Sequence, residues 1–122
     1  MKRIGSTTGG IALVLGLAAL VPSPAAAANQ RIVAFIGAVS SNYQTTSLTI
    51  SKGDTVSFQN LDLAPHDVTS SKLKKKRPIF QSRIVNFGAT TPVTGVHKVK
   101  AGKAYGYFCS IHPYMKGTLR VR

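Results

Sequence analysis

The segment from Cys109 to Met115 constrains the fold of this chain more than any other part of its sequence. A thiol, an imidazole and a thioether follow one another at three-residue intervals, at Cys109, His112 and Met115, and Cys109 is the only cysteine. Pro113 fixes its own backbone φ and restricts the residue before it, which favours a stiff loop. The sequence therefore predicts a fold in which a tight loop turns sulfur and nitrogen donors toward one point.

This combination of donors indicates a metal site. Thiolate, thioether and imidazole ligands suit copper, and a histidine far upstream, His66, completes a set of two imidazoles, one thiolate and one weak thioether. Zinc is the competing metal, but structural zinc sites use four Cys or His ligands, which leaves Met115 without a role. Two further interpretations are an inert buried cysteine and a Cys109–His112 nucleophilic pair. Copper is the interpretation that uses all four side chains.

The first 28 residues have the composition of a secretory signal peptide. Two basic residues precede an apolar run of 11 residues, and small residues follow it up to Ala28, which suits cleavage after Ala28 or Ala27. An uncleaved membrane anchor is the alternative, but the run is short against the roughly 20 residues that span a bilayer. We therefore expect a cleaved signal peptide at residues 1–28, one domain at residues 29–122, and export to the periplasm or the exterior.

The predicted domain carries a large excess of positive charge. Without Lys2 and Arg3, 14 of the 16 Lys and Arg residues remain, against three acids, Asp54, Asp62 and Asp67. Such an excess attracts anionic partners and surfaces, and it does not specify a fold.

Short β-branched and aromatic runs separated by turn residues follow the predicted leader, which is typical of an all-β sandwich or barrel. The expected strands cover residues 31–36, 47–50, 55–59, 66–69, 93–99, 104–109 and 116–121, with an irregular edge strand at 79–84. Residues 60–65 and 87–92 are expected to be loops. A helical turn is expected at most in residues 70–77, and His97 is expected to face solvent from its strand.

These residues match a known family. The stretch from Tyr105 to Val121, with its Cys-x-x-His-Pro-x-Met spacing, resembles the C-terminal copper loop of plastocyanin/azurin-type cupredoxins and is closest to the amicyanin type of loop. The segment from Ile50 to Val68 resembles the upstream ligand region of the same family. The resemblance implies a cupredoxin-like, Greek-key β-sandwich of about seven to eight strands. It also implies one type 1 (blue) copper ion, cycling between Cu(II) and Cu(I), near one end of the sandwich.

The resemblance also implies a role for each donor. His66, Cys109 and His112 are the implied equatorial copper ligands, and Met115 is the implied weak axial ligand. Many family members carry Asn after the upstream histidine, whereas this chain has Asp67. We expect this carboxylate to support the ligand loop through a hydrogen bond to Ser110, a kind of contact that tunes a metal site.

The function implied by the resemblance is the transfer of single electrons between redox partners outside the cytoplasm, without enzyme activity. The exposed edge of His112, ringed by Pro65, Pro113 and Tyr114, is the expected electron port. The alternative is copper storage, delivery or resistance without a redox cycle. Clusters of Met or His would favour that alternative, and the predicted mature chain has only Met115. A non-redox binding module on the same scaffold is a third option.

The densest charge run consists of Lys72, Lys74, Lys75, Lys76 and Arg77. We interpret it either as a solvated loop or as a patch that steers redox partners with acidic docking surfaces toward the protein. Anionic cell surfaces are a further candidate. Nucleic acid is not an expected partner, because the chain has no groove-reading or base-stacking motif. We expect the protein to act as a monomer.

Overall fold

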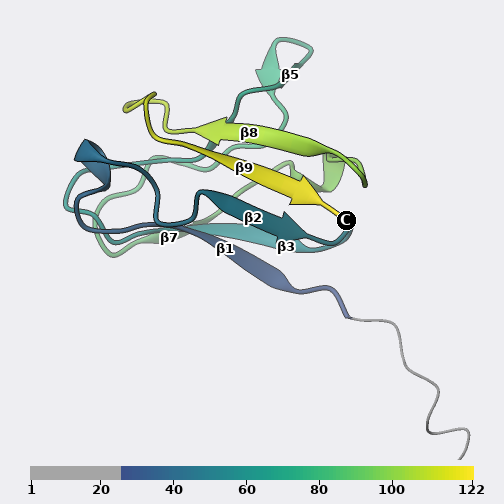
Figure 1. The fold of residues 1–122 in the computed structure, drawn as a ribbon, viewed down its shortest axis with the longest axis horizontal. Coiled ribbons are helices and arrows are strands. Elements are labelled where there is room, and N and C mark those ends of the chain that lie inside the picture. The colour runs from purple at the N-terminus through teal and green to yellow at the C-terminus, as the bar shows by residue number, and fades with distance from the viewer. Residues whose placement is uncertain (1–25) are drawn as a thin grey trace, which may run out of the picture.

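The computed structural model describes residues 26–122, which form two β-sheets packed against each other and a small separate hairpin (Figure 1). The first sheet contains β1 (Asn29–Ala34), β3 (Thr55–Asn60) and β7 (Thr90–Pro92), in the order β1-β3-β7. The second contains β2 (Ser47–Ile50), β9 (Lys116–Val121), β8 (Ala104–Phe108) and β4 (Thr69–Ser70), in the order β2-β9-β8-β4. The hairpin pairs β5 (Leu73–Lys74) with β6 (Arg77–Pro78).

Two short 3₁₀ helices, η1 (Ala38–Ser40) and η2 (Val96–Lys98), complete the described elements. Across residues 26–122 no helix is long and apolar enough to cross a membrane. The predicted signal peptide lies outside the described residues, except for residues 26–28. Its cleavage, and with it the boundary at residue 29, stays a prediction.

Alternating burial explains why the central strands form. In β3, Val56 and Phe58 are buried and their neighbours are less so, and in β8 Tyr105 and Tyr107 follow the same two-residue period. Successive side chains of a strand point to opposite faces, so each sheet buries one face against the other. The core lies between the two sheets.

The chain crosses between the two sheets several times. The chain runs from β1 in the first sheet to β2 in the second and back to β3, so that β1 pairs with β3 in parallel and β2 pairs with β9 in parallel. The remaining pairs within the sheets are antiparallel. The predicted all-β Greek-key sandwich is confirmed. Seven of the nine described strands belong to it, and β5 and β6 form the additional hairpin.

The strand predicted at residues 93–99 is wrong. Gly95 adopts a φ of 90° and begins η2. Val93, Val96 and Val99 are the buried residues of this segment, and burial at every third residue is the repeat of a 3₁₀ helix, not of a strand. His97 faces solvent as expected, although it does so from η2.

Three other segments differ from the prediction. Of the strand predicted at 66–69, only Thr69 lies in a strand, which is β4 (Thr69–Ser70). His66 makes only an isolated bridge to Val85. The predicted loop at 87–92 contains β7, whose Pro92 is tolerated because β7 is an edge strand. The turn expected within 70–77 is a β-hairpin. The irregular edge at 79–84 is confirmed as isolated bridges from Gln81.

Candidate metal centre

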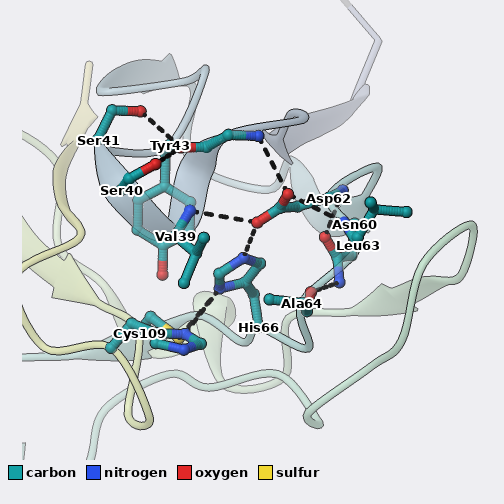
Figure 2. Close-up of polar contacts among 12 residues, drawn as sticks. Val39, Ser40, Ser41, Tyr43, Asn60, Asp62, Leu63, Ala64, His66 and Cys109 are labelled. Atoms are coloured by element: carbon teal, nitrogen blue, oxygen red, sulfur yellow. Dashed lines mark hydrogen bonds and ion pairs between the residues drawn. The ribbon is translucent and has the colours of Figure 1, made fainter.

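Three of the four predicted donor side chains meet at one end of the sandwich. Nδ1 of His66 lies 3.7 Å from Sγ of Cys109 and 3.1 Å from Nδ1 of His112. The distance from Sγ of Cys109 to Nδ1 of His112 is also 3.7 Å. All three donor atoms lie within 4.8 Å of one another, and Figure 2 shows the His66 ring directed at Cys109. The arrangement brings together residues from two stretches that are 43 positions apart.

The connection between β8 and β9 is closed by its own backbone hydrogen bonds. The N–H of His112 donates to the carbonyl of Cys109, and the N–H of Met115 donates to the carbonyl of His112. The N–H of Cys109 in turn donates to the carbonyl of Met115. These contacts confirm the tight loop predicted from the three-residue spacing. The side chain of Met115 is fully buried in this loop.

Asp62 orients His66, a role that was not predicted from the sequence. Its Oδ2 lies 2.6 Å from Nε2 of His66, and both side chains are buried (Figure 2). An ionised carboxylate can only accept hydrogen bonds, so Nε2 carries the ring proton and Nδ1 presents its lone pair to the other donors. A usable signal was present in the sequence, since Asp62 is one of only three acids and precedes His66 by four residues.

Backbone donors keep Asp62 ionised in its buried position. Its carboxylate accepts hydrogen bonds from the N–H groups of Gly37, Val39 and Leu63. Burial works against ionisation, but the contact with His66 and these backbone bonds outweigh it, so the pKa of Asp62 is lowered. The bonds from Gly37 and Val39 also attach the loop that contains η1 to Asp62.

Asp67 attaches the His66 segment to the β8–β9 loop, as expected from the sequence. Its Oδ1 accepts the N–H of Ser110 at 2.7 Å, and its Oδ2 accepts the hydroxyl of Ser110 at 2.6 Å. The carbonyl of Asp67 accepts the hydroxyl of Tyr43, whose ring is buried beside Phe58 and Tyr107. The two stretches that supply the donors are therefore cross-linked next to the site.

The surroundings of Cys109 suit a metal-bound thiolate. Burial raises the pKa of the thiol, and the backbone N–H groups of Asp67, Ile111 and His112 oppose part of this rise. A fully buried thiol with a raised pKa is protonated at neutral pH without a cation nearby. Metal coordination deprotonates it, and the converging lone pair of His66 Nδ1 adds to the attraction for a cation. The donor set of two imidazoles, a thiol and a nearby thioether fits copper.

The four residues differ in their access to solvent. His66, Cys109 and Met115 are completely buried, whereas His112 is partly exposed. Pro65, Pro113 and Tyr114, which were predicted to surround His112, are all exposed. The ring of Tyr114 packs edge-on to His112, with 6.1 Å between their centroids. Ile111 and Leu63 are also exposed large apolar residues in these two loops.

Comparison with known proteins places this geometry in a family. The model of a family described as copper binding proteins, plastocyanin/azurin family, matches residues 33–122. Amicyanin from Paracoccus versutus is 29% identical over 86 residues, which is 70% of this chain and 62% of the relative. The chain thus spans less than two thirds of the length of that curated relative.

Solved structures share the fold. A purple cupredoxin from Nitrosopumilus maritimus is 27% identical with a TM-score of 0.61, over 76% of this chain and 99% of that one. The crystal structure of amicyanin from Paracoccus versutus is 27% identical with a TM-score of 0.59, over 86% of this chain and 88% of that one. These similarities agree with the donor set and with the sandwich. The chain belongs to the plastocyanin/azurin family of copper-binding proteins.

Proposed function

We propose that this protein is a type 1 (blue) copper protein that carries single electrons between redox partners outside the cytoplasm. His66, Cys109 and His112 are the proposed equatorial ligands, and Met115 is the proposed weak axial ligand. The observation that carries the proposal is the convergence of Nδ1 of His66, Sγ of Cys109 and Nδ1 of His112 within 4.8 Å. A bound copper ion supplies a one-electron Cu(II)/Cu(I) couple.

The protein's own residues hold the donors in one arrangement. Asp62 and Asp67 fix the orientation of His66 and the position of the β8–β9 loop. The backbone hydrogen bonds within that loop restrict its movement. A site supported in this way changes little when the charge of its metal changes, which suits electron transfer more than storage or release.

The exposed edge of His112 is the proposed electron port. His112 is the only one of the four proposed ligands that reaches solvent. Pro113 and Tyr114, which follow His112 in the same loop, are exposed, and so is Pro65, which precedes His66. A redox partner that covers this surface brings its own centre close to the imidazole and excludes water from the contact.

Charge supports a partner of opposite sign. The 14 Lys and Arg residues beyond Lys2 and Arg3 face only three acids, so acidic partners are steered toward the protein over distances comparable with the Debye length. We expect the electron-transfer rate with an acidic redox partner to fall as ionic strength rises. An electron-transfer rate that does not depend on salt would contradict steering by the basic residues. It would not affect the proposed electron port at His112.

The ligand assignment is tested by Cys109→Ser in the copper-loaded protein. We expect the variant to lose the copper–thiolate absorption band and the reversible one-electron wave in voltammetry. His97→Ser is the matched control, since His97 is exposed on η2 and outside the donor cluster, and it should keep both signals. A storage or delivery protein is indicated instead if the unmodified protein binds copper but shows no reversible wave.

The proposed export is tested separately. We expect protein recovered from outside the cytoplasm to begin at Asn29 or Ala28 when its N-terminus is sequenced. Recovery of protein that still begins at Met1 and stays with the membrane would favour the anchor instead.

A further inference from the structure

The β5–β6 hairpin carries a concentration of positive charge away from the proposed electron port at His112 (Figure 1). Residues 72–77 are all exposed, and five of these six are Lys or Arg. Figure 1 shows the hairpin standing away from both sheets and apart from the β8–β9 loop. Its base is held by the backbone bond from Ile79 to Lys72 and by the buried side chains of Ile79 and Phe80.

The backbone of this hairpin is strained at its tip. The two-residue turn between Lys74 and Arg77 consists of Lys75 and Lys76, with φ angles of 52° and 65°. Such turns favour Asn-Gly, because side chains other than those of Gly, Asn and Asp are costly at positive φ. Lys74 and Arg77 also lie directly opposite each other, and like charges at paired positions destabilise a hairpin. The lysines of the turn and the Lys74–Arg77 pair therefore lower the local stability of the hairpin.

Further lysines extend this charge beyond the hairpin. Two grooves flank it, with Lys74 and Lys98 common to both, and one of them is also lined by Lys100 and Lys103. We define the hairpin patch as Lys72, Lys74, Lys75, Lys76, Arg77, Lys98, Lys100 and Lys103. These are eight of the 14 basic residues that follow Arg3.

No acid neutralises the hairpin patch within the described residues. The carboxylate of Asp54 accepts backbone N–H groups, that of Asp62 contacts His66, and that of Asp67 holds Ser110. The one ion pair among residues 26–122 is between His66 and Asp62. The patch is therefore free to bind an external anion.

An apolar residue lies in the middle of this charge. Leu73, on β5, is 57% exposed and is flanked in sequence by Lys72 and Lys74. A projecting hairpin that combines several lysines with an exposed leucine suits the interface of a bilayer, where charges meet headgroups and the apolar side chain enters the acyl boundary.

We propose that the hairpin patch docks this protein on the surface of bilayers that contain anionic phospholipids, with Leu73 entering the interface. Each Lys or Arg near an anionic bilayer surface contributes about 1 kcal/mol of attraction, and clusters of about four to eight such residues are typical of segments that bind anionic lipids. Because the hairpin is separate from the β8–β9 loop, a docked molecule keeps the edge of His112 accessible to a partner. The docking does not depend on the proposed electron transfer, since it requires no redox chemistry.

The test is co-sedimentation of the copper-loaded protein with vesicles at low and high salt. We expect binding to vesicles of phosphatidylcholine mixed with phosphatidylglycerol and little binding to phosphatidylcholine alone. The double variant Lys75→Asn/Lys76→Gly should lower the affinity by about tenfold or more, and it should raise the thermal midpoint, because it relieves the strained turn. A loss of binding with a raised midpoint cannot come from unfolding.

Two further variants separate the contributions of charge and apolar contact. Arg31→Gln/Arg120→Gln removes the same charge from exposed positions on β1 and β9 outside the patch, and it should lower the affinity far less. Leu73→Ser should reduce the binding that persists at high salt. Equal losses in the two charge variants, or no preference for anionic vesicles at low salt, would overturn the proposal. Binding to polyglutamate without binding to vesicles would assign the patch to an acidic protein instead.

Discussion

Nε2 of His66 and Oδ2 of Asp62 lie 2.6 Å apart, and this contact determines which nitrogen of the imidazole faces Cys109. The carboxylate keeps the proton on Nε2, so Nδ1 is left with a free lone pair among the donors. Asp62, a buried acid four residues before His66, thus determines which nitrogen of the His66 ring carries the proton.

Replacing Asp62→Ala should weaken copper binding. The His66 ring then loses its orienting partner, and contacts of this kind are typically worth about 10–100-fold in metal affinity. Competition with a chelator of known affinity measures the change. Asp62→Asn retains an acceptor oxygen and should lose less, and equal affinities of Asp62→Ala and the unmodified protein would contradict the orienting role.

Asp67→Asn should raise the reduction potential of the copper-loaded protein. The negative charge next to the ligand loop favours the oxidised metal, and an amide keeps the shape of the contact with Ser110 while removing the charge. A unit charge at this range, partly screened, contributes about 1 kcal/mol, which corresponds to an upward shift on the order of 50 mV. Voltammetry of both proteins at one ionic strength provides the measurement. A lower potential in the variant would reject the electrostatic explanation.

Tyr43→Phe should destabilise the fold. The buried hydroxyl of Tyr43 donates to the carbonyl of Asp67, and its loss leaves that carbonyl without this partner at an expected cost of about 1–3 kcal/mol. Urea unfolding of the copper-free protein measures this directly, without the stabilisation that bound metal adds. Tyr114→Phe is the matched control, because the hydroxyl of Tyr114 donates to Val39 at an exposed position and should matter less.

Gly117→Ala should also destabilise the protein, for a steric reason. Gly117 pairs with Tyr107 across β8 and β9, and a Cβ at residue 117 would lie 2.3 Å from Cζ of the Tyr107 ring. The ring has to move, and such overpacking typically costs about 1–3 kcal/mol. A Cβ at residue 106 in β8 would lie 3.2 Å from the hydroxyl of Ser71 and 4.0 Å from the carbonyl oxygen of Gly117, so Gly106→Ala should change the midpoint of thermal unfolding much less. Similar midpoints for the two variants would contradict this explanation.

Asp54 should make stability depend on pH. Hydrogen bonds from the N–H groups of Ala28 and Ser51 lower the pKa of Asp54 in the folded state. A lowered pKa stabilises the fold above the unfolded pKa of about 4, and this contribution is lost as pH falls through the folded value. Asp54→Asn should therefore lower the thermal midpoint at neutral pH, and the difference should close below about pH 4. In a chain that begins at Asn29 the hydrogen bond from the N–H of Ser51 remains. The pKa of Asp54 is then still lowered, so Asp54→Asn should still lower the thermal midpoint at neutral pH. A difference that does not vary with pH would contradict the electrostatic origin.

The strand predictions show where local pattern was sufficient. β2, β8 and β9 were predicted almost residue by residue, because alternating burial and flanking turn residues act within a few positions. The segment 93–99 was mispredicted because its three valines favour a strand, although their spacing of three residues does not match the two-residue period of a strand. The left-handed backbone of Gly95 begins η2, and the sequence alone does not show which glycines adopt a positive φ angle.

The metal centre likewise has a part that local sequence predicts and a part that it does not. The β8–β9 loop and the types of its donors could be predicted without the fold, because Cys109, His112 and Met115 lie within one short segment and their spacing is local. That Asp62 orients His66, and that His66 lies 3.7 Å from a thiol 43 residues later in the chain, follows from the folded arrangement alone. Packing of the two sheets sets those distances, and packing is the sum of many weak long-range contacts that no short pattern records.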